Sequence, residues 1–331
     1  MWQWDRYDRA IEAAGRDGKR IIGLLSYGAR WANDNPPTSS GPALFPPDDP
    51  ADYAAFAAAA VQRYRDRVHV WEVWNEENTI RFWMGAVRGD PAAYGTLLKA
   101  AYTAIKAADP DATVLFGGLF FHDQGLSTAA PEFIRQAHTA HPDLHEFYDG
   151  LSLHPYDLYP PRRGPESAVE GSLTIWEMVA QVREAMADHG AAGRDVWVTE
   201  FGWPTFPGVT DDEQAAYLVR ATLLLAAAGV RTACWYTLWD GPNPSDVIPE
   251  DQFGLFRWQE EAPADRVPNA KPSYEALVQM VDAVGDLGFI EDLSGGEGAE
   301  RHLVFGDAAG ARVSVRWNPE DTRLPTFSPR R

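Results

Sequence analysis

Apolar and polar positions follow two alternating patterns along the 331-residue chain. Short continuous apolar runs, such as residues 21–25 and 196–199, are typical of buried parallel strands. Longer segments in which apolar residues recur every three or four positions, such as residues 6–18, are typical of amphipathic helices. The pattern predicts strands near residues 21, 68, 113, 150, 196 and 232. It predicts helices over residues 6–18, 51–67, 91–108, 131–140, 173–189, 211–228 and 273–284, with Thr210 as an N-cap.

This alternation places the chain in the α/β class, with parallel strands covered by helices. A doubly wound sheet and a (β/α)8 TIM-type barrel both fit the order of elements. No glycine-rich phosphate loop follows a predicted strand, so a nucleotide-binding fold has no support. Polar and aromatic residues gather just after the strands, which is where the active sites of barrels lie. The barrel is therefore the better interpretation.

The end of the chain follows a different pattern. Residues 301–305 and 311–316 flank a turn at 307–310, which predicts a β-hairpin. We expect a barrel domain over residues 1–285 and a small C-terminal β extension over residues 286–331, packed on the barrel. Residues beyond Pro319 are expected to be disordered.

Composition and charge narrow the possible partners. The net charge of −19 argues against nucleic-acid binding, because a polyanion would be repelled. No apolar run approaches the ~18 residues that a membrane span needs. The N-terminus lacks the pattern of a signal peptide, and localisation and oligomeric state stay open. Cys234 is the one cysteine, so an internal disulfide is excluded, and its apolar neighbours predict an inert core position.

Two predicted strands each run directly into a glutamate. Glu76 follows the run of Trp and Val that ends at Trp74, and Glu200 follows residues 196–199. Burying a carboxylate at such a place is costly unless a site uses it. Glycoside hydrolysis needs a pair of this kind, with one carboxyl protonated and the other ionised. Helix capping or exposure to solvent explains one glutamate well, but it explains two in matching contexts poorly.

The segments Trp74-Asn75-Glu76 and Thr199-Glu200-Phe201-Gly202 resemble the fourth- and seventh-strand motifs of the clan A glycoside hydrolases, especially families 39 and 5. His154-Pro155-Tyr156 and Trp239 resemble the clan's sixth- and eighth-strand motifs, and the resemblance spans roughly residues 2–285. It implies a retaining enzyme that hydrolyses O-glycosyl bonds of β-linked oligo- or polysaccharides. The four motifs together are specific, whereas each tripeptide alone is weak.

The resemblance implies Glu76 as general acid/base and Glu200 as nucleophile. Asn75 would then bind the sugar 2-OH, Tyr156 would hold Glu200, and His154 would line the same floor. Aromatic candidates for sugar contact are Trp239 as a platform and Tyr27, Trp31, Trp203 and Trp235 as walls of subsites. Core packing is the alternative interpretation for His154 and Trp239, and a supporting role is the alternative for Tyr156.

Strict alternation along the strand places Glu72, Trp74 and Glu76 on one face and turns Asn75 away. Asn75 and Glu76 can therefore share a site only if the end of the strand is irregular. Glu72 is expected to lie deeper in the barrel with a structural role. Glu77 stands where the family usually has proline, and we expect its side chain to face outward.

The resemblance begins at the second helix of the family's barrel, so strands three to eight are present and the first two are missing. An open barrel of this kind would expose strand edges. A non-catalytic sugar-binding barrel, or a truncated pseudoenzyme, is therefore kept as an alternative, as is a transglycosylase. Sugar selectivity is expected to lie in the loops at 33–50 and 157–171.

A metal-dependent hydrolase is disfavoured, although histidines crowd the middle of the chain at 122, 138, 141, 145 and 154. His138 and His141 are expected on or near a helix surface, with no convergent set of ligands at the strand ends. We expect no metal and no cofactor, and a carbohydrate as the partner.

Overall fold

The computed structural model describes residues 3–34, 44–123, 125, 127–156, 164–166, 173–242, 249–258, 269–296 and 300–330. They fall into two compact units. Unit 1 comprises Met1–His154 and Gln181–Trp197, and unit 2 comprises Pro155–Ala180 and Val198–Arg331. Much of the two loops expected to set sugar selectivity lies outside the described residues.

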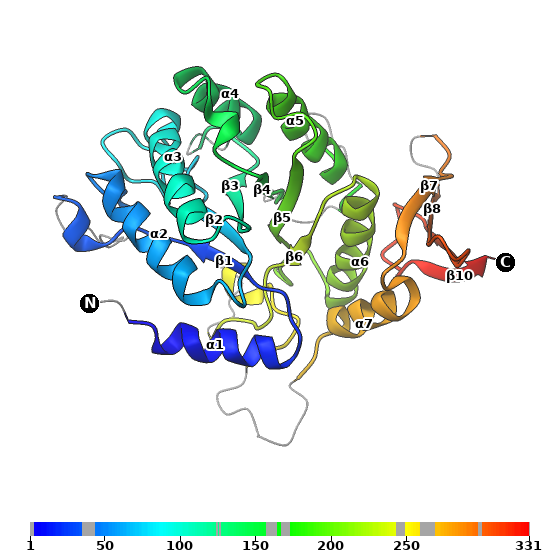
Figure 1. Cartoon of the computed structure of the whole chain (residues 1–331). Coiled ribbons are helices and arrows are strands. Elements are labelled where there is room, and N and C mark those ends of the chain that lie inside the picture. Colours follow the sequence, from blue (N-terminus) through cyan, green and yellow to red (C-terminus); the bar gives the residue numbers. More distant parts are fainter. Residues whose placement is uncertain are drawn as a thin grey trace. The chain divides into compact units, whose positions relative to one another are not determined.

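Six strands form one sheet in the order β1-β2-β3-β4-β5-β6. Neighbouring strands follow one another along the chain, and the pairs with a described register are parallel (Figure 1). This is the arrangement of a partial TIM-type barrel, and the six predicted strands are confirmed. Their numbering as strands three to eight stays a prediction. The strands are β1 (Ile22–Leu25), β2 (Val70–Asn75), β3 (Thr113–Phe120), β4 (Gly150–His154), β5 (Asp195–Phe201) and β6 (Ala233–Trp235).

The seven predicted helices are present, with ends that differ by a few residues. Capping residues fix several of their starts: the Asp90 side chain accepts hydrogen bonds from Ala92 and Ala93, and Thr210 and Glu213 form a capping box. In the described part of the chain, no helix is both long and apolar enough to cross a membrane. The helices are α1 (Asp5–Arg16), α2 (Pro50–Tyr64), α3 (Pro91–Ala108), α4 (Ala130–Ala140), α5 (Ile175–Ala187), α6 (Asp211–Ala227) and α7 (Pro272–Val284). Short 3-10 turns are η1 (Arg30–Ala32), η3 (Leu144–Glu146) and η4 (Pro249–Gln252).

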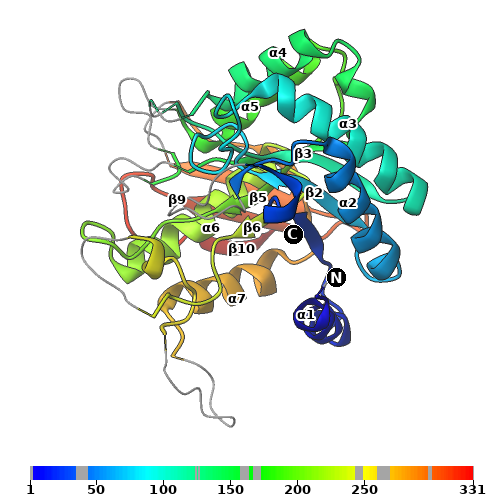
Figure 2. The same ribbon diagram turned by 90° about the vertical axis from the view of Figure 1, so that its left-hand side faces the viewer.

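In unit 1, helices α2, α3 and α4 lie side by side (Figures 1 and 2). The aromatic rings of Tyr94 on α3, Phe116 on β3 and Phe133 on α4 contact one another and are fully buried. Burial of an aromatic side chain contributes on the order of 2 kcal/mol or more to folding. This layer holds the N-terminal strands of the sheet in place.

Strand β1 stands at one end of the sheet, with β2 as its only partner among the described strands. Leu24 is 43% exposed, and α1 buries none of its residues although one of its faces is apolar. Side chains of α1, β1 and α2, among them Tyr7, Ile11 and Phe56, line a groove with a cavity volume of about 280 Å³. The expectation of an exposed strand edge is therefore confirmed for the described part of unit 1.

The C-terminal extension is a four-stranded antiparallel sheet in unit 2, in the order β10-β9-β8-β7. The predicted hairpin forms its centre, but the prediction of disorder beyond Pro319 was wrong. Residues 326–330 pair with β9 over their whole length, because the short run still offers a complete ladder of backbone hydrogen bonds. The strands are β7 (Gly288–Asp292), β8 (Arg301–Gly306), β9 (Arg312–Trp317) and β10 (Thr326–Arg330).

A buried arginine ties this extension to a barrel helix. Arg220 of α6 is fully buried, and its Nη2 donates to the backbone carbonyls of Asn318, Asp321 and Arg323, just before β10. Its Nη1 lies 3.9 Å from the carboxylate of Glu166, which also accepts from the indole of Trp317. The expected packing of the extension on the barrel therefore holds at α6.

Candidate functional site

The end of β2 has an unusual backbone. Trp74 and Glu76 have positive φ values of 73° and 49°, a region that residues other than glycine rarely occupy. Such conformations cost ~1–3 kcal/mol each and persist where the surrounding structure enforces them, often at functional sites. The Glu76 amide donates to the carbonyl of Gly118 on β3 at 2.9 Å, which helps to hold the distorted end. The end of β2 is therefore irregular, as Asn75 and Glu76 require if both are to face one site, and this prediction is confirmed.

Glu76 is held by a histidine within unit 1. The half-buried carboxylate of Glu76 lies 3.1 Å from Nδ1 of His154, which ends β4 and is fully buried. The other ring nitrogen of His154 lies 3.9 Å from the carboxylate of Glu72. Glu72 is buried, as expected from its place deeper in the strand. Each nitrogen of this buried imidazole therefore faces a carboxylate, and an imidazole in such a place can carry a positive charge.

Asn75 is fixed next to Glu76 by an aromatic side chain. Its Nδ2 donates to the hydroxyl of Tyr27 at 3.2 Å, and Tyr27 packs between the rings of Trp74 and Phe82. The buried Oδ1 of Asn75 has no hydrogen-bond partner among the described residues. A ligand hydroxyl would satisfy this acceptor.

Glu77 corrects one prediction. Its side chain does not face outward: it is fully buried, and a Cβ on Gly117 of β3 would meet its carboxylate oxygens at 2.2 Å. Burial, with the negative charge of Glu72 added, raises the pKa of Glu77 well above its ordinary value. Because Gly117 has no side chain, the carboxylate of Glu77 has room to turn inward, where an exposed acid was expected.

In unit 2, Glu200 lies within β5 one residue before its end and is half-buried. The hydroxyl of Tyr156 donates to Oε2 of Glu200 at 3.1 Å. Tyr156 is itself buried, and its ring contacts Tyr236 and Phe253. The tyrosine therefore offers the carboxylate a fixed donor.

The three tryptophans of unit 2 that were predicted to contact sugar differ in exposure. Trp235 and Trp239 are half-buried, and Trp203 is only 3% exposed. Trp203 stacks on Trp235 and packs against Tyr217 of α6, so it supports the wall that Trp235 presents. Trp239 packs on Phe256.

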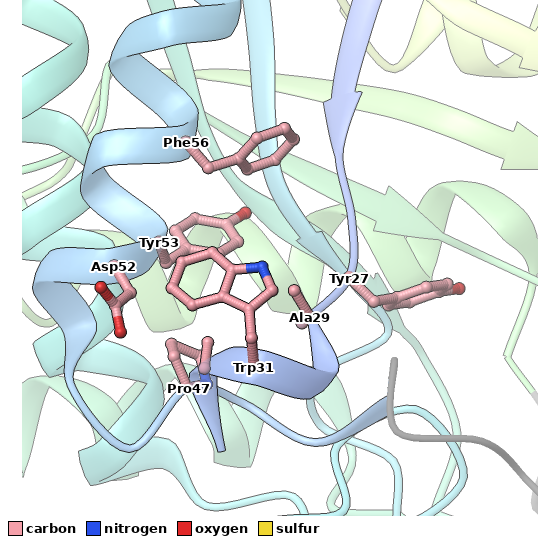
Figure 3. Close-up of a pocket in the computed structure, with 9 residues that line it drawn as sticks. Tyr27, Ala29, Trp31, Pro47, Asp52, Tyr53 and Phe56 are labelled. Atoms are coloured by element: carbon pink, nitrogen blue, oxygen red, sulfur yellow. The ribbon is translucent and has the colours of Figure 1, made fainter. Parts of the chain in front are cut away.

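Trp31 lies over a pocket in unit 1 with a cavity volume of about 110 Å³. Figure 3 shows the indole of Trp31 close to Tyr53 and Phe56, while the ring of Tyr27 points away from them. Trp31 is 66% exposed, and the carboxylate of Asp52 also lines the pocket. The pocket has the mixture of aromatic faces and polar atoms that small polar ligands use.

Two smaller predictions need correction. His138 was expected at a helix surface, but it is buried, because its Nδ1 bonds to the Ile134 carbonyl and its ring stacks on His189. Cys234 was expected in the core, but it is only half-buried, as β6 is along its length. Among the described residues, His122, His138, His141 and His145 join no group of three possible metal ligands.

The sequence interpretation missed the two glycines of β3. A Cβ on Gly118 would lie 2.4 Å from Nε2 of His154 and 2.5 Å from the carboxylate of Glu72, and Gly117 makes the same kind of room for Glu77. The signal was available, because glycine inside an apolar strand marks a close approach.

Comparison with solved structures shows which proteins this chain is similar to. A family 39 glycoside hydrolase from the gut symbiont Bacteroides cellulosilyticus WH2 is 26% identical, with a TM-score of 0.71, over 96% of this chain and 61% of that chain. The chain is thus similar to the family 39 glycoside hydrolases of clan A. The predicted resemblance to family 39 is thus confirmed. No family model matches the chain, and no curated protein matches it.

Two further structures extend the clan A likeness at the level of fold. A monomeric β-xylosidase from Caulobacter crescentus CB15 is 20% identical, with a TM-score of 0.64, over 95% of this chain and 62% of that chain. A family 51 α-L-arabinofuranosidase from Bifidobacterium longum is 13% identical, with a TM-score of 0.61, over 94% and 64%. The chain therefore spans less than two thirds of the length of each of these three structures.

Proposed function

We propose that this chain is a retaining glycosidase that cleaves β-glycosidic bonds, with Glu76 as general acid/base and Glu200 as nucleophile. The observation that carries the proposal is the strained backbone of Glu76, whose carboxylate is nevertheless fixed on a buried histidine. A glutamate can be exposed to solvent without backbone strain. A strained φ at Glu76 is therefore explained better by a functional role of its carboxylate than by folding alone.

The two glutamates suit different roles. Glu76 has one carboxylate oxygen fixed on His154, which leaves the other oxygen to protonate the leaving group and later to activate water. Glu200 accepts a hydrogen bond from a tyrosine hydroxyl, which favours its ionised form, as a nucleophile requires. Each glutamate follows an apolar run of a parallel strand, β2 for Glu76 and β5 for Glu200.

The contacts with sugar are part of the same proposal. Asn75 would bind the 2-OH through its unpartnered oxygen, and Trp239 and Trp235 would present ring faces to the sugar. We also assign residues 1–285 to the barrel and residues 286–331 to the β extension, a division supported by the start of the antiparallel sheet at Gly288.

Activity on aryl β-glycosides tests the roles of the glutamates. Glu76→Ala and Glu200→Ala should each lower kcat by two to four orders of magnitude, about the contribution of one catalytic carboxyl. Added azide should restore turnover in both variants, giving the β-glycosyl azide with Glu76→Ala and the α-glycosyl azide with Glu200→Ala. Unchanged hydrolysis in either variant, or the reverse pairing of products, would show that the assignment is wrong.

The pocket beneath Trp31 is a proposed subsite for a second sugar ring, stacked on the indole and hydrogen-bonded to Asp52. Trp31→Ala should weaken the binding of an oligosaccharide about tenfold, because a lost aromatic contact costs ~1–1.5 kcal/mol. Activity on a monosaccharide aryl glycoside should be unaffected. Trp258→Ala removes a tryptophan of similar exposure, at 48%, and serves as the control in calorimetric titrations. Equal affinities of the Trp31 variant and the wild type would exclude the subsite.

A non-catalytic sugar-binding barrel is the second candidate, because β1 has a partner on one side only among the described strands. The same azide experiment separates the two. A wild type that binds oligosaccharides but hydrolyses none of the aryl glycosides would establish the binding function instead.

A further inference from the structure

Glu72, Glu76 and His154 meet although β2 and β4 are not neighbours in the sheet. Strand β3 lies between them, and neighbouring strands are about 4.8 Å apart, so the two backbones are roughly 10 Å apart. Side chains that cross this distance have to pass over β3. Gly118 permits this passage, because any Cβ there would lie within 2.5 Å of both Nε2 of His154 and the carboxylate of Glu72.

The crossing places an acid on each side of one imidazole. Oε1 of Glu76 lies 3.1 Å from Nδ1 and Oε1 of Glu72 lies 3.9 Å from Nε2. Glu72 is 2% exposed and His154 is 0% exposed, so water screens their interaction poorly. A buried carboxylate beside a buried imidazole is far more stable when the imidazole carries a proton on the facing nitrogen.

We propose that Glu72 is a positioning residue that keeps His154 protonated on both ring nitrogens, so that Nδ1 donates to Oε1 of Glu76 and leaves Oε2 to exchange the proton with the leaving group. The inference rests on the acid/base role proposed for Glu76. The proton that reaches the leaving oxygen comes from Glu76 and returns to it from water, and His154 keeps both of its protons throughout.

Among the described residues of unit 1, Glu77 is a further acid near this group, and its charge interacts with both Glu72 and His154. Burial raises the pKa of Glu77, so its neutral form adds little negative charge to the cluster. Glu72 is therefore the acid whose constant negative charge keeps the imidazole of His154 protonated, while Glu76 changes its protonation during the reaction.

The dependence of kcat/KM on the leaving group separates positioning from structural support. Glu72→Gln keeps the shape of the side chain but removes its charge. It should lower kcat/KM about tenfold or more for phenyl glycosides, which need acid assistance. It should leave kcat/KM within about twofold of the wild type for dinitrophenyl glycosides, which leave without a proton. Glu77→Gln, an isosteric change at the neighbouring buried acid, is the matched control and should not alter this dependence.

Equal losses on both substrates would overturn the proposal, since a distorted site would slow both, and so would no loss on either. Imidazole 15N resonances of His154 in the wild type give a measurement that does not depend on the variant folding. Two protonated ring nitrogens at neutral pH are expected, and a neutral ring would overturn the proposal. The spectrum also separates the two proposals: a wild type without glycosidase activity but with a doubly protonated His154 would remove the acid/base role alone.

Discussion

At the scale of single residues, Glu77 shows how a carboxyl can be buried without an ionic partner. Neither of its oxygens has a hydrogen-bond partner among the described residues, and no side chain on Gly117 competes for the space. Protonation removes the charge that burial would otherwise penalise. Glu77 therefore serves as a neutral polar filler beside a charged residue.

This burial predicts how stability depends on pH. Glu77 is neutral in the folded chain at pH values at which it is ionised in the unfolded chain, since its pKa is raised from the ordinary 4.5. The contribution of Glu77 to the free energy of unfolding is complete below pH 4.5. It is lost as the pH rises from there to the raised pKa, by up to about 1.4 kcal/mol per pH unit. Glu77→Gln should therefore raise the free energy of unfolding at neutral pH and change it little at pH 4.

Urea denaturation of both proteins across this pH range checks the sign. Glu300→Gln, at a side chain that is 58% exposed, provides the control and should show no such trend. A Glu77→Gln variant that is less stable than the wild type at every pH would contradict a neutral buried carboxyl.

Tyr156 carries a second prediction for a single residue. Its hydroxyl donates to Glu200, and a hydrogen bond to a charged group is worth about 1.5–3 kcal/mol. If Glu200 is the nucleophile, Tyr156→Phe should lower kcat/KM for aryl glycosides about 10- to 100-fold, and the acidic limb of the pH profile should move to higher pH. Tyr7→Phe, at a tyrosine that is 58% exposed, should change neither quantity. An unshifted acidic limb would argue against the role of the hydrogen bond.

At the scale of elements, Arg220 of α6 donates hydrogen bonds to three backbone carbonyls in the segment before β10. Removing one partner of a buried ion pair costs about 3–5 kcal/mol, because the other charge stays buried. Arg220→Ala should therefore lower the free energy of unfolding by roughly that amount, and hydrogen exchange should quicken in β10 first. The surface pair of Arg316 and Glu300 gives the matched control, since exposed pairs contribute about 0–1 kcal/mol. Similar losses for Arg220→Ala and Arg316→Ala would contradict the link.

The sequence predicted elements well because local signals specify them. Apolar runs and capping residues such as Asp90 and Thr210 act over a few positions, and six strands and seven helices were found from them. β10 was missed because Thr326–Arg330 is short and acquires its structure by pairing with the preceding strand β9. Pairing partners are decided by tertiary contacts, which a local period does not contain.

The candidate site divides in the same way. The positions of Glu76, Glu200 and Tyr156 at strand ends followed from motif and period. The inward turn of Glu77 and the contact between Glu72 and His154 did not, because both depend on what a neighbouring strand leaves empty. Gly117 and Gly118 hold that information, and it acts across strands.

At the scale of the whole molecule, the continuous parallel sheet and the separate antiparallel sheet are joined by one chain with a net charge of −19. Charge of one sign keeps copies of a protein apart at neutral pH. The polar backbone groups along the outer side of β1 would otherwise offer a template for pairing with another chain.

These two features together predict a colloidal property. Near the isoelectric point of about 4.7 the repulsion between molecules vanishes, while the outer side of β1 and its exposed Leu24 remain. Light scattering should therefore rise sharply as a solution is acidified toward that pH, and Leu24→Lys should delay the rise, because a charge on an edge strand opposes association. A variant with Val278→Lys adds the same charge at a helix position of similar exposure (40%). It therefore separates the effect of the strand edge from the effect of added charge. Equal delays in both variants would assign the effect to charge alone. The side of β1 without a partner among the described strands thus limits the buffers in which this chain can be concentrated, and an acidic crystallisation or assay condition would favour its self-association.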